Sequence, residues 1–203
     1  MDYSNCTLCP RMCGVDRTQG QQGVCCTLRC RYCQNGAISS GPVGTPMDPG
    51  QLRQAMEALI CQGAENIDLV TPTQFLPTLI PALSPKLPVP VVYNCGGYER
   101  VETLKELEGL VDIYLPDMKY ASSILAAQLS RAGDYPEVAK AAIQEMVRQT
   151  GPVLWQGDRV IRGTIIRHLI LPGQVENSLR VLDWIGETFR PGEVLVSLMR
   201  QYT

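Results

Sequence analysis

Three cysteines stand within eight residues of one another, in the stretch CTLRCRYCQN. They are Cys26, Cys30 and Cys33, and the aromatic Tyr32 precedes the third. A cubane [4Fe–4S] cluster normally takes four thiolates, so three thiolates from one short loop would leave one iron free to bind a small ligand as a Lewis acid. The alternative is a tetrahedral zinc site that another cysteine completes, although zinc sites more often use paired Cys-x2-Cys units.

A second group of cysteines lies near the start of the sequence. Cys6, Cys9, Cys13 and Cys25 have the spacing Cys-x2-Cys-x3-Cys-x11-Cys, which could hold a structural zinc ion or a second iron–sulfur cluster. Free thiols are the alternative interpretation. The chain has nine cysteines in all, and this odd number argues against a framework of disulfides.

Composition and charge exclude several classes of protein. The chain has 203 residues, a net charge of −2 and a polar N-terminus, so we expect neither a nucleic-acid partner nor a membrane partner. We expect a cytoplasmic protein whose thiols are reduced. His168 is the only histidine, which excludes metal sites that are built from several histidines.

Apolar segments alternate with helical patterns along the rest of the chain. Short apolar runs predict strands over residues 66–70, 89–94, 111–116, 165–171 and 194–199. Helical spacing predicts helices from Asp48 to before Gly63 and over residues 99–108, 136–149 and 177–189. Residues 75–83 also have helical spacing, but two prolines make that segment irregular. This alternation is typical of an α/β protein with a parallel sheet.

Polar residues follow several of the predicted strands. Thr71 and Asn94 end two of them, and Asp117 with Lys119 follows a third. Ligands of parallel sheets bind at the carboxyl ends of the strands, so we expect a site there. Arg167 and His168 are neighbours on one strand and must point to opposite faces, so only one of them can face such a site.

Several stretches together carry a resemblance to a known family. They are CTLCPRMCG, CTLRCRYCQN, NIDLVTPTQFLP, VVYNCGGYE, VDIYLPDMKY and IIRHLILPG. With them, the chain resembles the pyruvate formate-lyase activating enzyme-related branch of the radical S-adenosylmethionine superfamily. The resemblance implies an α/β fold, a partial (βα)6 TIM-like barrel over residues 26–203, preceded by a cysteine-rich metal-binding segment over residues 1–25.

The same resemblance implies an activity. Cys26, Cys30 and Cys33 would hold a [4Fe–4S] cluster whose open iron binds S-adenosyl-L-methionine, and a reductant such as flavodoxin or ferredoxin would supply electrons. Reductive cleavage would then give a 5′-deoxyadenosyl radical that takes a hydrogen atom from the substrate. The substrate could be a glycyl radical enzyme, another peptide or a small molecule. The alternative is a non-catalytic iron–sulfur or zinc protein for electron transfer or assembly.

The resemblance also implies which side chains contact the cofactor. Asp117 and Lys119 match a D-x-K pair that would bind its methionine carboxylate and ribose region, whereas an ordinary surface ion pair is the alternative. Further implied contacts, each with a structural alternative, are Tyr32, Thr71, Thr73, Asn94 and His168. The two threonines stand where activating enzymes usually carry Gly-Gly-Glu, so the contact with the cofactor's amino group departs from the pattern.

One departure concerns the length of the chain between two adjacent cysteines. Relatives carry a substantial stretch with the first barrel strand between the positions of Cys25 and Cys26, which are neighbours here. Only five strands are predicted, one fewer than the six of the barrel. We therefore expect residues to be missing from the sequence at that point and after Thr203.

Overall fold

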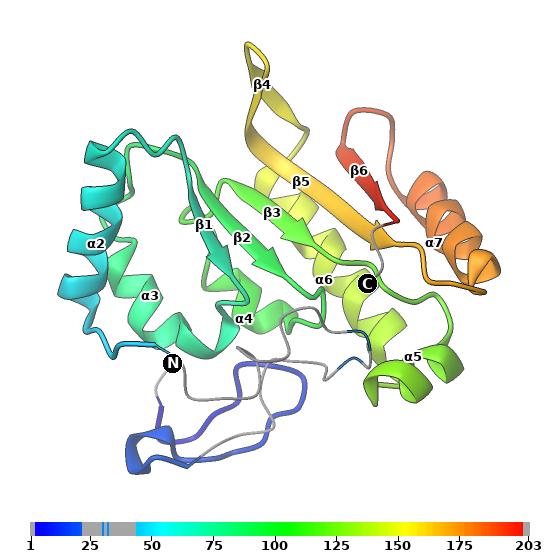
Figure 1. The fold of residues 1–203 in the computed structure, drawn as a ribbon, viewed down its shortest axis with the longest axis horizontal. Helices are drawn as coiled ribbons and strands as arrows, with labels where there is room; N and C mark the ends of the chain where they lie inside the picture. Colours follow the sequence, from blue (N-terminus) through cyan, green and yellow to red (C-terminus); the bar gives the residue numbers. More distant parts are fainter. Residues whose placement is uncertain (1–2, 22–29, 31, 33–43, 201–203) are drawn as a thin grey trace.

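The computed structural model describes residues 3–21, 30, 32 and 44–200, and within them the protein is a mixed α/β structure with a six-stranded sheet (Figure 1). The strands are β1 (Ile67–Val70), β2 (Val91–Cys95), β3 (Ile113–Pro116), β4 (Leu154–Gln156), β5 (Arg159–Leu169) and β6 (Val194–Met199). Strands β1, β2, β3, β5 and β6 are parallel and lie in that order. The short β4 pairs antiparallel with the first part of β5 as a hairpin.

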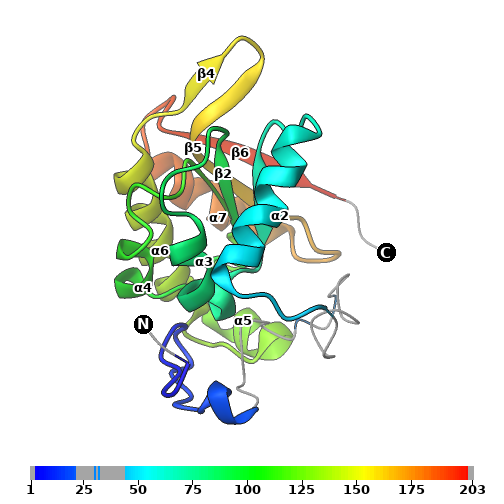
Figure 2. The same ribbon diagram turned by 90° about the vertical axis from the view of Figure 1, so that its left-hand side faces the viewer.

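One helix precedes the first strand, and the others lie in the connections between the strands. The helices are α2 (Pro49–Cys61), α3 (Leu76–Ala82), α4 (Val101–Lys105), α5 (Ser123–Ser130), α6 (Tyr135–Thr150) and α7 (Val175–Thr188), with 3-10 turns η1 (Arg17–Gln19) and η2 (Thr73–Phe75). Figure 2 shows α4, α6 and α7 together on one side of the sheet. We call the opposite side the open face. None of the helices in the described part of the chain is long and apolar enough to cross a membrane.

The start of α2 shows how local sequence sets an element boundary. Asp48 caps the helix by accepting a hydrogen bond from the backbone N–H of Gln51, whose side chain bonds back to Asp48. Pro49 occupies the first helical turn, where its missing N–H costs nothing. These three residues account for the beginning of the helix where the sequence predicted it.

The predicted strands are confirmed, with two omissions elsewhere. All five predicted strands are present, although β5 begins at Arg159 rather than at residue 165 because the hairpin with β4 extends it. Both α5 and β4 were missed, and both are short segments without a clear apolar period. Within the described residues the sheet does not close into a barrel, and its sixth strand, β4, runs antiparallel to β5. β4 is therefore not the first barrel strand, which we expected to be missing between Cys25 and Cys26.

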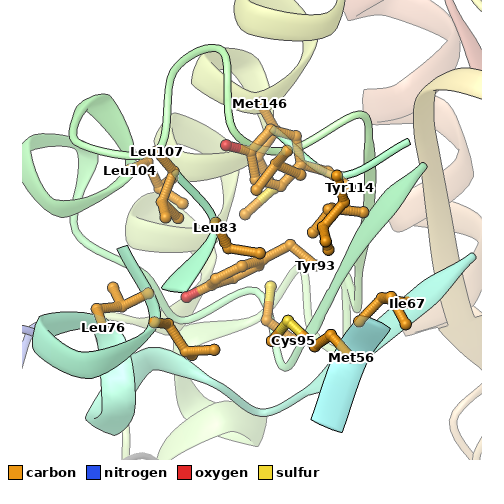
Figure 3. Packing of buried hydrophobic residues seen from close by; sticks show 14 of the residues in the cluster. Met56, Ile67, Leu76, Leu83, Tyr93, Cys95, Leu104, Leu107, Tyr114 and Met146 are labelled. Atoms are coloured by element: carbon orange, nitrogen blue, oxygen red, sulfur yellow. The ribbon is translucent and has the colours of Figure 1, made fainter. Parts of the chain in front are cut away.

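Packing between the sheet and the helices forms the core. Tyr93 of β2 and Tyr114 of β3 meet edge to face, with ring centroids 5.7 Å apart, and Leu83, Leu104 and Met146 pack around them (Figure 3). Such aromatic side chains each bury a large apolar area, and that burial is the main favourable contribution to folding. A second cluster, which includes Ile143, Ile166, Val181 and Ile185, joins α6 and α7 to β5.

Alternation along β5 separates the two faces of the sheet. Thr164, Ile166 and His168 are buried beneath the helices, whereas Ile165 and Arg167 are only half-buried. Successive side chains of a strand point to opposite faces, so Arg167 belongs to the open face. In the register of the sheet, Arg167 lies beside Asp117. In Figure 1, β1, β2 and β3 run toward the side of the molecule on which the N-terminal segment Tyr3–Gln21 lies.

Gly97, which follows β2, should be intolerant of any side chain. Its φ is +78°, and an added Cβ would lie 2.1 Å from the Asp117 carbonyl oxygen. We expect Gly97→Ala to lower the free energy of unfolding by about 1–2 kcal/mol because of the left-handed conformation, and by about a further 1–3 kcal/mol because of the overpacking. Chemical denaturation measures the sum of the two losses.

Gly109→Ala is the matched control for this substitution. Gly109 has a φ of +83°, but an added Cβ would meet nothing within 4 Å. This variant should therefore lose only the conformational part. Equal losses in the two variants would contradict the close approach of β2 and β3 at Gly97.

Candidate functional site

Charged and amide side chains meet on the open face, where β2, β3 and β5 end. Nη2 of Arg167 lies 2.8 Å from Oδ1 of Asn94 and 2.8 Å from Oδ1 of Asp117. Nζ of Lys119 pairs with the other carboxylate oxygen of Asp117. The amide of Asn94 donates to Asp68 of β1 at 3.3 Å. The network therefore crosses four neighbouring strands, and we call Asp117, Lys119 and Arg167 the charged triad.

The charged triad holds two cations for one anion. Burial lowers the pKa of Lys119, but the negative charges of Asp117 and Cys30 outweigh it, so the net shift of this pKa is upward. Lys119 therefore stays protonated. Asp117 Oδ1 and Arg167 Nε are buried and make no hydrogen bond within the described residues. Oδ1 of Asp117 forms an ion pair with Nη2 of Arg167, but this contact is not aligned as a hydrogen bond. Oδ1 of Asp117 and Nε of Arg167 can therefore each form a hydrogen bond with a ligand.

Cys30 and Tyr32 of the three-cysteine motif reach the same end of the sheet. Sγ of Cys30 lies 2.9 Å from Oγ of Ser130, the last residue of α5. The Ser130 hydroxyl also lies 2.6 Å from the hydroxyl of Tyr120, which lies 2.5 Å from that of Tyr32. Tyr120 directly follows Lys119, so these contacts place Cys30 and Tyr32 beside the segment that carries Lys119.

Burial is the main cause of the raised pKa values of Tyr32 and Tyr120. Burial raises the pKa of Tyr120 to about 12 and raises the pKa of Tyr32 still further, with Cys30 contributing to both shifts. Both phenols are therefore neutral at physiological pH. Cys26, Cys33 and Cys25 lie outside the described residues, so the ligand set predicted for a cluster stays a prediction.

His168 does not lie on the open face. It is fully buried beneath α7, with Nδ1 2.6 Å from the Met118 carbonyl and Nε2 2.8 Å from Oγ of Ser178. Burial lowers its pKa, so the ring is neutral at pH 7. Both ring nitrogens are occupied inside the protein, which fits the alternative of a satisfied core histidine. We therefore correct the site: Arg167, the other neighbour on this strand, faces the charged triad.

The two threonines after β1 have different surroundings. Thr73 is buried, and its hydroxyl donates to Glu99 at 2.8 Å and lies 3.1 Å from the hydroxyl of Tyr93. That hydroxyl is therefore used in the interior rather than at a cofactor site. Thr71 is half-buried at the end of β1 and has a φ of +50°, a conformation that costs a β-branched residue energy and that is found most often near functional sites.

Glu99 is a buried carboxyl group that sequence analysis did not single out. Burial raises its pKa to about 8, the neighbouring Cys9 adds to the rise, and hydrogen bonds from Thr73 and Tyr93 offset part of it. Glu99 is therefore mainly protonated at neutral pH. Its position after a Gly-Gly pair resembles an exposed turn, so the sequence contains no signal of its burial.

The N-terminal cysteines lie in a looped segment that is docked on the helices. Cys6 and Cys9 are buried and Cys13 is half-buried. The carbonyl of Leu8 accepts a hydrogen bond from Thr103 of α4 at 2.8 Å. Within the described residues no three metal-binding side chains gather into one group, and the metal site predicted for this segment stays a prediction.

A cavity of about 590 Å³ opens beside the end of β1. Leu52, Leu69, Val70, Pro72 and Phe75 are among its apolar lining residues. Polar groups of Asp68, Gln74 and Arg17 also face it, and Oε1 of Gln74 is buried without a hydrogen bond from any described residue. Asp68 joins the cavity to the network that ends at the charged triad.

Comparisons with known proteins leave the activity open. No family model matches the chain. The chain is similar to the uncharacterized protein MJ0674 of Methanocaldococcus jannaschii, with 24% identity over 241 residues that include 98% of this chain. The chain spans 66% of the length of that relative. Because the aligned stretch is longer than the 203 residues of the chain, it includes positions that this chain lacks.

Glu99 should make the stability of the metal-free protein depend on pH. Its folded pKa of about 8 lies above the unfolded value of 4.5, so the folded state binds more protons in this interval and stability falls as the pH rises through it. Glu99→Gln should remove this fall, which we expect to amount to about 3–5 kcal/mol. Urea denaturation on both sides of the interval measures it.

Glu102→Gln provides the control, since the side chain of Glu102 is 70% exposed. This variant should keep the pH dependence of the original chain. If Glu99→Gln keeps it as well, Glu99 is ionised in the folded protein and its assignment as a neutral acid is wrong.

Proposed function

We propose that the protein is a radical S-adenosylmethionine enzyme whose site lies at the carboxyl ends of β2, β3 and β5. The observation that carries the proposal is the series of contacts that links Cys30 to Tyr120, the residue that directly follows Lys119. Sγ of Cys30 contacts the hydroxyl of Ser130, which in turn contacts the hydroxyl of Tyr120. These contacts support a site that one of the three motif cysteines would share with the D-x-K pair.

The donor set at this site fits the proposed cofactors. Three thiolates from Cys26, Cys30 and Cys33 would hold a [4Fe–4S] cluster, and the ammonium group of Lys119 would balance part of their negative charge. When bound, the cluster supplies the electron for reductive cleavage of the sulfonium compound. The described residues contribute the ordered surroundings in which that chemistry would take place.

The charged triad has the groups needed to bind an amino acid headgroup. Lys119 offers a point charge to a carboxylate, and Arg167 offers its unused Nε–H as a directed donor. The free bonding capacity of Asp117 Oδ1 suits an ammonium or hydroxyl group. Asn94 holds the guanidinium of Arg167 in place from β2.

A second function stays in consideration. A non-catalytic iron–sulfur or zinc protein would need the cysteines but not the charged triad. Burying two cations and one carboxylate together costs desolvation energy that packing alone does not require. The triad at the motif therefore favours an enzyme over an electron carrier or an assembly factor.

The substrate is a narrower part of the proposal. We favour a peptide segment of a partner protein, as in an activase for a glycyl radical enzyme, because the sheet does not close among the described residues and the cavity beside β1 opens to the surface there. A small molecule in the same cavity is the alternative. Flavodoxin or ferredoxin would serve as the electron donor.

Product formation tests the enzyme directly. After anaerobic reconstitution with iron and sulfide, the protein with dithionite and S-adenosyl-L-methionine should produce 5′-deoxyadenosine, measured by chromatography. Cys30→Ala should abolish the product because the cluster loses a ligand. Cys61→Ala, at an exposed cysteine of α2, is the matched control and should keep it. A fully reconstituted cluster without any product would favour the electron-transfer alternative.

Lys119→Ala tests the role of the charged triad in binding. We expect the affinity for S-adenosyl-L-methionine to fall by about 10- to 100-fold, the effect of losing a charge-assisted hydrogen bond, while iron content stays unchanged. Isothermal titration and iron analysis measure the two quantities.

Lys86→Ala is the control for Lys119→Ala, since Lys86 also pairs with an aspartate, Asp112, at the opposite end of β3. It should bind the cofactor normally. Loss of iron in Lys119→Ala would instead identify Lys119 as a residue that supports the cluster loop.

A further inference from the structure

The chain directly after β3 is held in place by side chains from three other elements. The hydroxyl of Tyr135, at the start of α6, lies 2.6 Å from the Asp117 carbonyl and accepts the N–H of Lys119 at 3.0 Å. Tyr135 is fully buried, so water does not compete for these bonds. Tyr135 therefore fixes the backbone on both sides of Met118.

Helix α7 holds the same segment from another direction. Nδ2 of Asn177 donates to the Lys119 carbonyl at 3.0 Å, and Oδ1 of Asn177 accepts the N–H of Ala121 at 2.9 Å. Asn177 is buried in the first turn of the helix. The position of Lys119 thus depends on where α7 packs.

His168 completes this arrangement through Met118. Its Nδ1 lies 2.6 Å from the Met118 carbonyl, and its Nε2 lies 2.8 Å from the Ser178 hydroxyl. A carbonyl oxygen can only accept, so Nδ1 carries the proton and Nε2 accepts from Ser178. The N–H of Met118 in turn donates to the Arg167 carbonyl at 2.8 Å.

These hydrogen bonds fix the orientation of one peptide group, the one between Met118 and Lys119. The Met118 carbonyl and the Lys119 N–H belong to the same planar group, and His168 binds one while Tyr135 binds the other. Turning this plane would redirect the side chain of Lys119 away from Asp117. It would also break two buried hydrogen bonds, and leaving a buried donor or acceptor without a partner costs free energy.

We propose that His168 is a positioning residue, which holds the Met118–Lys119 peptide plane so that Lys119 and Asp117 both project onto the open face. Residues 117 and 119 share one face because side chains alternate along an extended segment. Met118 is fully buried on the opposite face. Only the cofactor part of this inference rests on the proposed function.

Two substitutions of His168 test its hydrogen bonds to Met118 and to Ser178 one at a time. In His168→Asn, the amide nitrogen is attached to Cγ, as Nδ1 is, so this variant can still donate to Met118. In His168→Gln, the polar atoms lie farther along the side chain, so the variant can bond Ser178 but not Met118. If His168 acts through Met118, His168→Asn should keep Lys119 in its original position and His168→Gln should not.

The first measurement needs no cofactor. Amine acylation followed by peptide mass mapping gives the rate at Lys119 relative to Lys86, the matched lysine paired with Asp112. We expect Lys119 to react about three- to tenfold faster in His168→Gln, as expected from losing one hydrogen bond, and at the original rate in His168→Asn. An unchanged rate at Lys119 in folded His168→Gln overturns the inference.

The second measurement uses the fact that His168 is the only histidine. The ¹⁵N spectrum of the imidazole should show a neutral ring protonated at Nδ1. A ring protonated at Nε2 alone overturns the inference, because the bond to Met118 would then be impossible. This result does not depend on any bound group.

Cofactor affinity in the same variants distinguishes the two proposals. The dissociation constant of S-adenosyl-L-methionine should rise in His168→Gln in parallel with the acylation rate and stay unchanged in His168→Asn. A faster acylation of Lys119 without weaker binding would keep His168 as a positioning residue and would overturn the use of Lys119 in the proposed function.

Discussion

The pairing of β3 with β5 is the constraint on which the candidate site depends. Their parallel register continues past the end of β3 and places Asp117 beside Arg167, which forms the buried ion pair at the centre of the charged triad. A shift of one residue would turn Arg167 toward the helices and His168 toward the open face. The hydrogen bonds of His168 to Met118 and Ser178 oppose that shift, so the core and the site favour the same register.

The two faces of the sheet have different tasks. Beneath the helices, Tyr93, Tyr114 and Ile166 bury apolar area and supply stability. On the open face, the charged triad keeps buried polar atoms without partners among the described residues, which costs stability. Buried side chains beneath the helices thus hold the charged side chains of the open face in position, an arrangement in which a fold can preorganise a binding site.

Elements distant in the sequence close around the end of β3. Tyr135, Asn177 and His168 come from α6, α7 and β5, and each bonds the backbone next to Lys119. Cys30 and Tyr32 approach from the N-terminal side through Ser130 and Tyr120. The proposed cofactor site and its supports are therefore built from several elements that are distant in the sequence rather than from one motif.

Local sequence determined most of the elements, although not α5 and β4, since apolar periods depend only on neighbouring residues. The apolar periods located all five parallel strands, and the sequence identified Asp117, Lys119 and Asn94 at the carboxyl ends of these strands. The sequence also showed that Arg167 and His168 must point to opposite faces, but only the packing of α7 on β5 decided which one is buried. Burial of Glu99 and the contacts of Tyr135 likewise depend on long-range packing, because an apolar environment is created by residues that are distant in sequence.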